Sequence, residues 1–446
     1  MDEQQRRTIS RRQFLTGLGV GAGALVLAAC GAQPGASGGA STAPTAGSAA
    51  SAASGEVQFW DMVWGPPEYI DTAKRVAEQD FTAANPGITV SYQSNPWSSW
   101  PQVFTTAVGS GTAPDVSTGG GYQAIQFYPQ DAILEIDDLV AEIGVDAFLP
   151  GQIDGMYYNG HYIALPWGID IRIPFYRKDL FEQAGVAPPT TLEELRAALK
   201  ALTRGEQYGI AFAGASPLGW QSIVSLMYMF GGGFFTADNQ LDVMNDRNIE
   251  GLTFVADLIK DGVVHPGSAG FQDADLSRAF GTGSAAVMFF SPSAEERVPE
   301  IKDQVGILSP MTGPHGDKAT LMFANNLMIY KQTRNPDATK AFLKWWSENS
   351  LPIWTEGHAG NLPARRSIAA DPYFQENPFI KPIIDEWVPV GRLTGNHSTG
   401  TFPALADIDA GGMLNTLATD LLQGRDVTET LQKLETTLKG LKSLQA

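Results

Sequence analysis

The chain has 446 residues, of which 43% are hydrophobic and 17% are charged, and its formal net charge is −18. This composition excludes wholesale disorder, which needs low hydrophobicity and high charge, and a single cysteine, Cys30, excludes a disulfide scaffold. So acidic a chain is poorly suited to nucleic acid, whose phosphates need clustered Lys and Arg. At roughly 150 residues per domain, the length predicts two or three domains.

The first thirty residues have the pattern of an export signal. Arg11 and Arg12 precede Phe14, and an apolar run over 17–29 follows that is too short to span a bilayer. The paired arginines resemble the twin-arginine signal, and the end of the run, Leu27-Ala28-Ala29-Cys30, resembles the lipobox of bacterial lipoproteins. We therefore expect residues 1–29 to be removed and Cys30 to carry a lipid that tethers the protein to a membrane surface.

Residues 31–54 consist almost wholly of Gly, Ala, Ser, Thr and Pro and carry no charge. Such a segment cannot bury enough apolar surface to order itself, so 30–54 is predicted to be a lipidated cysteine followed by a flexible linker. The folded body then begins at residue 55.

Strand and helix patterns alternate along this body. A strand is predicted at 57–60, a helix after Pro66-Pro67 and a second strand at 88–92, which together make one β-α-β unit. A helix near 103–108 and a strand at 115–116 follow. Further on, the pattern predicts helices over 192–202 and 252–259, a buried strand at 285–290, and a helix that starts at Asn335-Pro336. The tail over 414–441 is helical with a break at Gly424. This alternation predicts an α/β fold with two doubly wound lobes.

Several segments resemble one family, the extracellular solute-binding proteins of the sugar-binding class, which includes maltose-binding protein. Residues 81–90 match its F-x-x-x-N-P-x-I-x-V pattern, and residues 111–116 match G-x-x-P-D-V. Residues 185–195, together with Ala184 before them, match the family pattern A-G-x-x-P-P-x-T-x-x-E-L. Residues 360–366 contain its G-x-x-P-x-R segment. Each motif alone is weak, but in this order they cover the whole body.

The resemblance implies a periplasmic-binding-protein-like fold of type II, in which a multi-strand hinge joins two α/β lobes around a ligand cleft. One lobe would comprise 55–166 and 325–372, and the other 171–321 and 376–446. It implies a monomer outside the cytoplasm that captures a carbohydrate, here a neutral oligosaccharide, and delivers it to the permease of an ABC transporter. No catalysis, cofactor or metal is implied.

Candidate ligand contacts lie in loops after strands, because ligands of open α/β sheets sit beyond the carboxyl ends of the strands. Aromatic faces would pack on sugar rings, and carboxylates, amides and arginines would bond hydroxyl groups. In the resembled family an acidic residue at the position of Asp170 binds sugar hydroxyls, and a tryptophan at the position of Trp220 stacks on the sugar. The predicted ligand-binding residues are Asp61, Trp64, Asn95, Trp97, Gly120, Tyr122, Trp167, Asp170, Arg172, Trp220, Ser291, Asn325, Asn326, Asn361 and Arg365.

Several of these residues also have a purely structural interpretation. Asp61 could cap the helix after Pro66, and Arg365 could anchor its own loop. Asp170 and Arg172 could form a structural ion pair. Asn325 and Asn326 could instead satisfy buried backbone groups at a chain crossing.

Other function classes find less support in the sequence. The five histidines are scattered without an H-E-x-x-H motif, and G-x-S-x-G is missing. The serious alternative is a secreted carbohydrate-active enzyme, which needs two carboxylates about 5–10 Å apart. Asp137-Asp138, Glu295-Glu296 and Asp407/Asp409 are available pairs, although adjacent acids are usually solvated surface. A tethered sugar sensor, or a protein that binds a phosphorylated polyol or a polyamine, also stays open.

Overall fold

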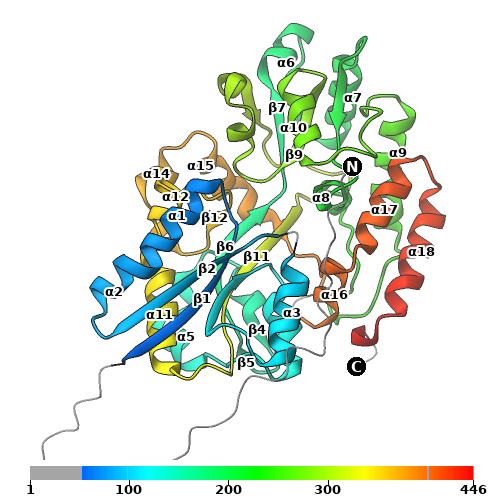
Figure 1. Cartoon of the computed structure of the whole chain (residues 1–446). Coiled ribbons are helices and arrows are strands. Elements are labelled where there is room, and N and C mark those ends of the chain that lie inside the picture. Colours follow the sequence, from blue (N-terminus) through cyan, green and yellow to red (C-terminus); the bar gives the residue numbers. More distant parts are fainter. Residues whose placement is uncertain (1–52, 98, 399–400, 445–446) are drawn as a thin grey trace, which may run out of the picture. The chain divides into compact units, whose positions relative to one another are not determined.

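The computed structural model describes residues 53–97, 99–398 and 401–444, and Figure 1 shows the course of the chain. The described residues belong to one compact unit. The predicted signal with Arg11 and Arg12, the predicted lipid site at Cys30 and almost all of the predicted linker lie outside the described residues. The predictions for these segments therefore stay predictions.

Within the described residues, seven strands form the larger sheet: β1 (Gly55–Met62), β2 (Ile88–Asn95), β3 (Val116–Gly119), β6 (Leu165–Ile171), β11 (Thr320–Ile329), β12 (Leu362–Pro363) and β13 (Gly391–Arg392). Their order is β12-β6-β11-β3-β1-β2, and β13 pairs with β11. The predicted β-α-β unit is confirmed, since β1 lies parallel to β2 and the helix α1 (Pro67–Arg75) follows β1. β1 is also parallel to β3, whereas β11 is antiparallel to both β3 and β6.

A second sheet contains β7 (Ile173–Arg177), β8 (Tyr208–Ala211), β9 (Ala285–Phe290) and β10 (Val305–Ile307) in the order β10-β7-β9-β8. β8 is parallel to β9, and β7 is antiparallel to β9 and β10. All six residues of β9 are buried, as its apolar run predicts. A two-stranded pair, β4 (Tyr157–Tyr158) and β5 (His161–Tyr162), stands apart from both sheets.

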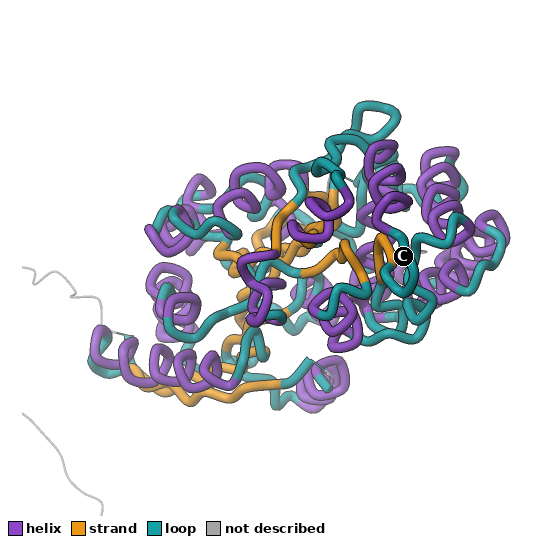
Figure 2. The backbone as a smooth tube through the Cα atoms, turned by 90° about the horizontal axis from the view of Figure 1, so that it is seen from above, coloured by secondary structure: helices purple, strands orange, loops and turns teal. Residues whose placement is uncertain are grey.

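Helices pack around these sheets, and Figure 2 shows most strands in the interior with helices outside them. In chain order the longer helices are α1, α3 (Trp100–Ser110), α5 (Asp137–Ile143), α6 (Lys178–Ala184), α7 (Leu192–Leu202), α8 (Pro217–Tyr228), α9 (Asp246–Lys260), α10 (Asp273–Gly281), α11 (Pro336–Asn349), α16 (Ala404–Ala410), α17 (Met413–Leu422) and α18 (Val427–Lys439). The shorter α-helices are α2 (Phe81–Ala84), α4 (Gln123–Phe127), α12 (Pro352–Thr355), α13 (Arg366–Ala369), α14 (Pro372–Gln375) and α15 (Ile380–Pro382). The remaining turns are π-helical at η1 (Val76–Asp80) and η7 (Ile383–Trp387), and 3-10 at η2 (Tyr128–Gln130), η3 (Val145–Ala147), η4 (Asp154–Met156), η5 (Ala294–Arg297), η6 (Pro299–Gln304), η8 (Val388–Val390) and η9 (Lys442–Leu444).

Helix boundaries follow local chemistry. The predicted helix near 103–108 begins earlier, at Trp100, where Pro101 occupies a first-turn position that needs no N–H donor. The tail helix breaks at Gly424, as predicted, where the backbone has a φ of +79° that glycine adopts without strain. Asp426 then caps α18 by accepting the Glu429 N–H.

The chain passes from the larger sheet to the second at a single residue. β6 ends at Ile171 and β7 begins at Ile173, so Arg172 lies at the crossing. The Arg172 N–H donates to the Leu321 carbonyl on β11 at 3.0 Å. The chain returns to the larger sheet between β10 and β11. Because β6 and β11 are hydrogen-bonded neighbours, the two crossings lie side by side at one edge of the larger sheet.

Candidate functional site

A cavity of about 450 Å³ opens beside this crossing. The loops after β1, β2 and β3 contribute to one part of its wall, and α8, α10 and the loop after β9 contribute to another. Its lining comprises Trp64, Trp97, Trp100, Gly120, Gly121, Asp170, Arg172, Pro217, Leu218, Gln221, Asp273, Phe290, Ser291, Arg297, Phe323, Asn325 and Asp409. Because β1, β2 and β3 are parallel, their carboxyl ends meet at one sheet edge, and this is where a ligand is expected in an α/β fold.

Tryptophan rings form one wall of the cavity. The Trp64 ring lies 4.8 Å from the Trp97 ring at 83°, and Trp97 lies 6.5 Å from Trp100 at the same angle. Behind them Trp167 is 4.8 Å from Trp64. Trp97 is 39% exposed, and the Trp97 ring packs over Gly120, where an added Cβ would touch it at 3.5 Å. Rigid, partly exposed aromatic rings of this kind offer large apolar faces to a ligand.

A charged cluster faces the cavity at the chain crossing. The Arg172 guanidinium donates to both carboxylate oxygens of Asp170, at 2.5 and 2.7 Å, and to the Gln221 side-chain oxygen at 2.6 Å. It also lies 5.6 Å above the Phe323 ring. Arg172 is 6% exposed, so its charge is held by partners on β6 and α8. The ion-pair interpretation is therefore confirmed, and both residues of the pair also line the cavity.

Asp409 on α16 completes this cluster. Burial raises the pKa of Asp409 to about 7; Arg172 opposes the rise and Asp170 adds to it. Arg172 and Asp170 thus act on Asp409 through space, and in this partly desolvated place a second negative charge is disfavoured. At neutral pH Asp409 is able both to donate a hydrogen bond, when protonated, and to accept one.

The cavity continues into hollows on two sides. A hollow of about 250 Å³ shares Trp97, Trp100, Gly120, Pro217, Gln221 and Asp409 with it and is lined further by the predicted residues Tyr122 and Trp220. Tyr122 also accepts the Thr394 N–H at 2.9 Å. A hollow of about 690 Å³ shares Asp273, Phe290 and Arg297 and extends along α10. Together with these two hollows, the cavity forms a cleft that is longer than the cavity alone.

Of the predicted ligand-binding residues, Trp64, Trp97, Gly120, Asp170, Arg172, Ser291 and Asn325 line the cavity, and Tyr122 and Trp220 line the smaller adjoining hollow. Six others lie outside both linings: Asp61, Asn95, Trp167, Asn326, Asn361 and Arg365. Each of these six has local contacts that account for its place in the structure.

Three of the six make hydrogen bonds with residues of the strands and loops around the cavity. Asp61 is fully buried, and four side-chain donors occupy its carboxylate. Asn95 is 3% exposed, with its amide nitrogen 3.4 Å from the Asp61 carbonyl. Asn326 accepts the Ala124 N–H at 2.9 Å and donates to the Gly121 carbonyl at 3.1 Å, which matches its structural interpretation.

The other three belong to the core or to their own loop. Trp167 is buried and stacks on Trp354 at 5.8 Å. Asn361 is 5% exposed, and its carbonyl accepts the Trp354 indole N–H at 2.8 Å. Arg365 pairs with Glu348 at 2.9 Å, so it anchors its own segment, as its structural interpretation holds.

Some cavity residues were not predicted: Gln221, Asp273, Arg297, Phe323 and Asp409. Gln221 is adjacent to the predicted Trp220, and Phe323 lies opposite Asp170 in the β6–β11 register. The sequence suggests Asp409 only as one member of a carboxylate pair with Asp407. No sequence signal connects Asp409 on α16 with the Asp170–Arg172 pair, since only the fold brings them together.

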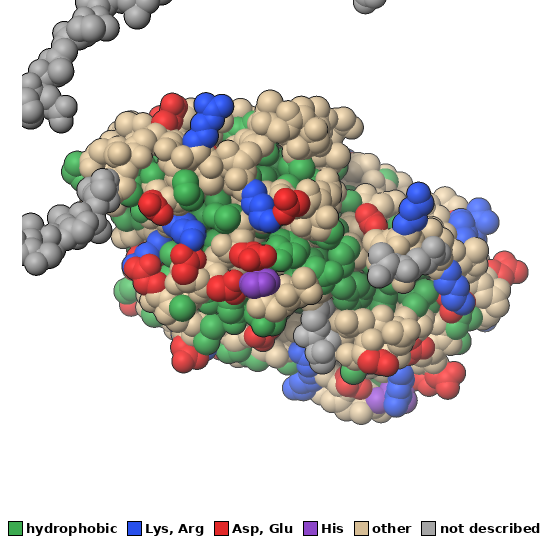
Figure 3. Space-filling model, turned by 90° about the horizontal axis from the view of Figure 1, so that it is seen from below, with side chains coloured by type: hydrophobic (Ala, Val, Ile, Leu, Met, Phe, Trp, Pro, Cys, Tyr) green, Lys and Arg blue, Asp and Glu red, His purple; other side chains and the backbone are tan. Residues whose placement is uncertain are grey.

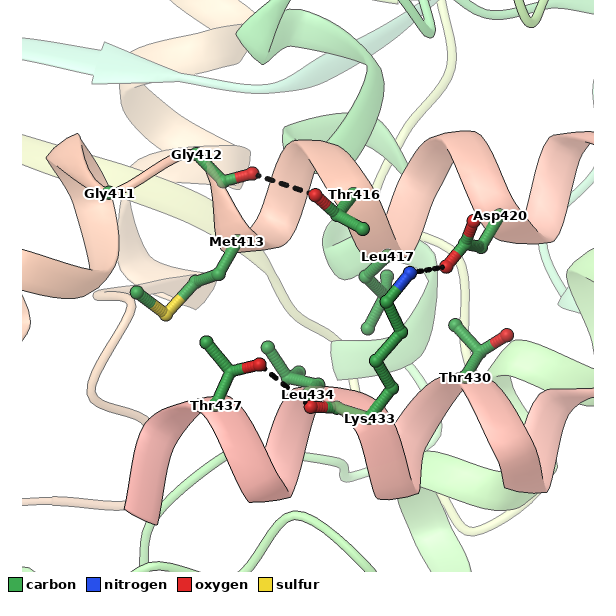
Figure 4. A pocket seen from close by; sticks show the side chains of 10 residues that line it. All are labelled: Gly411, Gly412, Met413, Thr416, Leu417, Asp420, Thr430, Lys433, Leu434 and Thr437. Carbon is green, nitrogen blue, oxygen red and sulfur yellow. Dashed lines mark hydrogen bonds and ion pairs between the residues drawn. The ribbon is translucent and has the colours of Figure 1, made fainter. Parts of the chain in front are cut away.

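A smaller hollow of about 230 Å³ lies between α17 and α18 (Figure 4). Lys433 reaches across it to the Asp420 carboxylate at 2.6 Å, and Arg425 pairs with the same carboxylate at 2.9 Å. None of its ten lining residues is aromatic. The Asp420 carboxylate is neutralised by these two cations, so the hollow offers a ligand neither a free charge of Asp420 nor an aromatic face.

Metal-ligand spacing occurs at one place among the described residues. Ligand atoms of Glu135, Asp137 and His161 lie within 4.8 Å of one another. The His161 ring nitrogen is 2.8 Å from Asp137, which with Glu135 raises the pKa of His161. This group lies outside the cavity lining.

On the face seen in Figure 3, acidic and basic side chains are interspersed rather than gathered by sign.

Comparison with known proteins identifies the class. Residues 66–350, more than half of the chain, match the family of bacterial extracellular solute-binding proteins. The chain belongs to this family, as its motifs predict. The family consists of binding proteins, and not one of the described helices is long and apolar enough to cross a membrane.

Three relatives with known ligands are similar over most of the body. A sugar transporter from Arthrobacter chlorophenolicus A6, solved with bound laminaribiose, is 35% identical with a TM-score of 0.79, and the match covers 87% of this chain and 99% of that one. The mannitol-binding protein of Pseudomonas aeruginosa is 28% identical over 64% of this chain and 68% of its own. The maltotriose-binding protein of Pyrococcus abyssi is 24% identical over 73% and 70%. The predicted two-lobed α/β fold is confirmed by this likeness.

Proposed function

We propose that this protein captures a neutral oligosaccharide in the cavity beside Arg172 and delivers it to the permease of an ABC transporter. The observation that carries the proposal is the wall of Trp64, Trp97 and Trp100 set against polar groups from the other side of the cavity. Ring faces would pack on the apolar faces of the sugar, and Asp170, Gln221 and Asp409 would bond its hydroxyl groups. The ligand would be bound and released without a broken bond.

The charge of the cavity supports a neutral ligand. Its lining includes three carboxylates, Asp170, Asp273 and Asp409, and two arginines, Arg172 and Arg297. Asp170 already neutralises Arg172, so Arg297 is the remaining cation of this lining that could hold a phosphate. The same ion pair occupies Asp170, so it also removes a carboxylate that the ammonium groups of a polyamine would need.

The length of the cleft supports more than one sugar ring. Hollows adjoin the cavity on both sides, and each shares lining residues with it. Laminaribiose and maltotriose, the ligands named for two relatives, are oligosaccharides. The mannitol-binding relative favours a linear polyol as the second candidate.

Capture would involve movement of the two lobes about the crossing at Arg172. We place one lobe in residues 55–166 and 325–372 and the other in 171–321 and 376–446. Hinge residues that end strands absorb such movements in binding proteins. Closure would bury the sugar, and the permease would recognise the closed form.

The membrane tether is a separate part of the proposal. The lipobox-like end of the apolar run supports lipidation at Cys30 and a location on the outer face of the cell membrane. Cys30→Ser should abolish the incorporation of a labelled fatty acid into the protein without changing sugar affinity. A Cys30→Ser protein that still incorporates the label would contradict the tether alone.

The binding proposal is tested by melting temperature with a panel of laminaribiose, maltotriose and mannitol. The full chain with Cys30→Ser is used, so that lipid does not interfere. A ligand at a hundredfold excess over Kd stabilises the folded state by about 2.7 kcal/mol. We expect a saturable shift with one oligosaccharide, recovered uncleaved. Cleaved sugar would favour the enzyme alternative, and a shift with mannitol alone would favour the polyol.

A further inference from the structure

The carboxylate of Asp61 sits at the end of β1 inside a cluster of hydrogen-bond donors. Its Oδ2 accepts the Tyr69 hydroxyl at 2.7 Å and the Tyr92 hydroxyl at 3.1 Å. Its Oδ1 accepts the Thr118 hydroxyl at 2.5 Å and the Trp64 indole N–H at 3.2 Å. Asp61 is 0% exposed. All four donors are uncharged, and among the described residues no Lys, Arg or His pairs with this carboxylate.

A buried carboxylate without a cation is an expensive way to hold a fold together. Removing such a group from water is unfavourable unless hydrogen bonds compensate. Here burial raises the pKa of Asp61 to about 6, although all four hydrogen bonds act to lower it. The one donor in the cluster that also lines the cavity is Trp64.

The contacts of Trp64 fix the ring in one orientation. Its N–H edge is directed at Asp61 and at the Thr118 hydroxyl, 3.1 Å away. Trp97 packs against it from one direction and Trp167 from another, each at 4.8 Å. An indole N–H only donates, so the buried acceptor decides which edge of the ring points inward. The remaining ring surface is then presented to the cavity.

We propose that Asp61 is a positioning residue, which sets the orientation of the Trp64 ring through its indole N–H and thereby tunes the carbohydrate affinity of the cavity. This inference rests on the proposed function. It assigns Asp61 no contact with the ligand. It requires that Asp61 act on affinity only through Trp64.

A double-mutant cycle tests this requirement, with laminaribiose as the probe. Asp61→Ala should weaken binding about tenfold, as expected for loss of a hydrogen bond to a charged acceptor. In a Trp64→Phe background, which has no indole N–H, Asp61→Ala should change Kd less than twofold. Equal weakening in both backgrounds, or unchanged affinity with Trp64 present, would overturn the proposal.

Two further variants separate positioning from folding. Tyr69→Phe removes a donor from the other carboxylate oxygen, so it should lower the melting temperature and leave Kd unchanged. Asp61→Asn should restore most of the affinity, because its amide oxygen can still accept the Trp64 N–H while its NH₂ donates to a tyrosine hydroxyl. If Asp61→Ala does not fold, Asp61→Leu, which fills the same buried space without an acceptor, takes its place in the cycle with the same two expected outcomes.

A measurement without ligand keeps this inference distinct from the proposed function. In protein with ¹⁵N-labelled tryptophan, the Trp64 indole resonance is identified by its loss in Trp64→Phe. It should shift as the pH passes through 6, and Asp61→Asn should abolish that shift while Tyr69→Phe does not. If no carbohydrate binds but the resonance shifts with pH in a way that Asp61→Asn abolishes, the proposed function fails and the Asp61–Trp64 link stands. A resonance indifferent to Asp61→Asn would contradict the link whether or not sugar binds.

Discussion

Asp409→Asn should stabilise the protein, and the gain should grow with pH. Burial raises the pKa of Asp409 from its ordinary 3.8 to about 7, against the attraction of Arg172. Between these values the folded state holds a proton that the unfolded state has released. The free energy of unfolding therefore falls as the pH rises through this window, and asparagine removes the effect because it does not ionise.

The magnitude follows from the two pKa values. A rise from 3.8 to about 7 corresponds to about 4 kcal/mol, at about 1.4 kcal/mol for each pH unit. Asp409 borders the cavity and is only partly buried, so water there screens part of its charge. We expect a gain of about 2–4 kcal/mol above pH 8 that declines to near zero below pH 4.

Urea unfolding at several pH values between 4 and 8.5 measures this gain. Asp407→Asn is the matched control, because Asp407 lies two residues earlier on α16 and is exposed. The difference between Asp409→Asn and wild type should widen with pH, whereas the control should show no such trend. A difference that is constant across the pH range, or a less stable Asp409→Asn protein at pH 8, would refute the reasoning.

Three other substitutions test the site and its support. Trp97→Ala should weaken carbohydrate binding at least tenfold in calorimetry, with little loss of stability because the Trp97 side chain is 39% exposed. The control is Tyr157→Ala, at an exposed aromatic residue outside the cavity lining, which should leave the affinity unchanged. Asn326→Ala should lower the free energy of unfolding by about 2 kcal/mol in urea, because a buried α4 N–H 2.9 Å away loses its acceptor, and an unchanged midpoint would argue against that role. Gly168→Ala should lower the melting temperature, because its Cβ would come within 2.3 Å of the Asn361 amide nitrogen; full stability would show that this amide moves freely.

The sequence predicts the fold and one wall of the cavity because both follow local rules. Alternating elements predict two α/β lobes, and parallel strands bring Trp64, Trp97 and Gly120 to one edge. Asp61 shows the limit of the loop argument. It shares the inward parity of Val57 and Phe59 on β1, so strand periodicity, applied one residue further, would have placed it in the interior.

The opposite wall depends on contacts between distant segments. Asp409, Gln221 and Arg297 come from α16, α8 and η5, and each has the local sequence context of an ordinary polar residue. Arg365 fits a family motif, yet it pairs with Glu348 on α11 and is not among the lining residues of the cavity. Ion pairs of this kind depend on packing angles between helices and loops, which a single sequence does not encode at short range.

The central claim is that carbohydrate binds in the cavity beside Arg172. A crystal structure of the full chain carrying Cys30→Ser, grown with the oligosaccharide that gives the largest melting shift, tests it most directly. We predict a sugar ring packed on Trp64 or Trp97, with a hydroxyl group within hydrogen-bond distance of Asp170 or Asp409. Sugar bound elsewhere on the body, with this cavity free of it, would contradict the account.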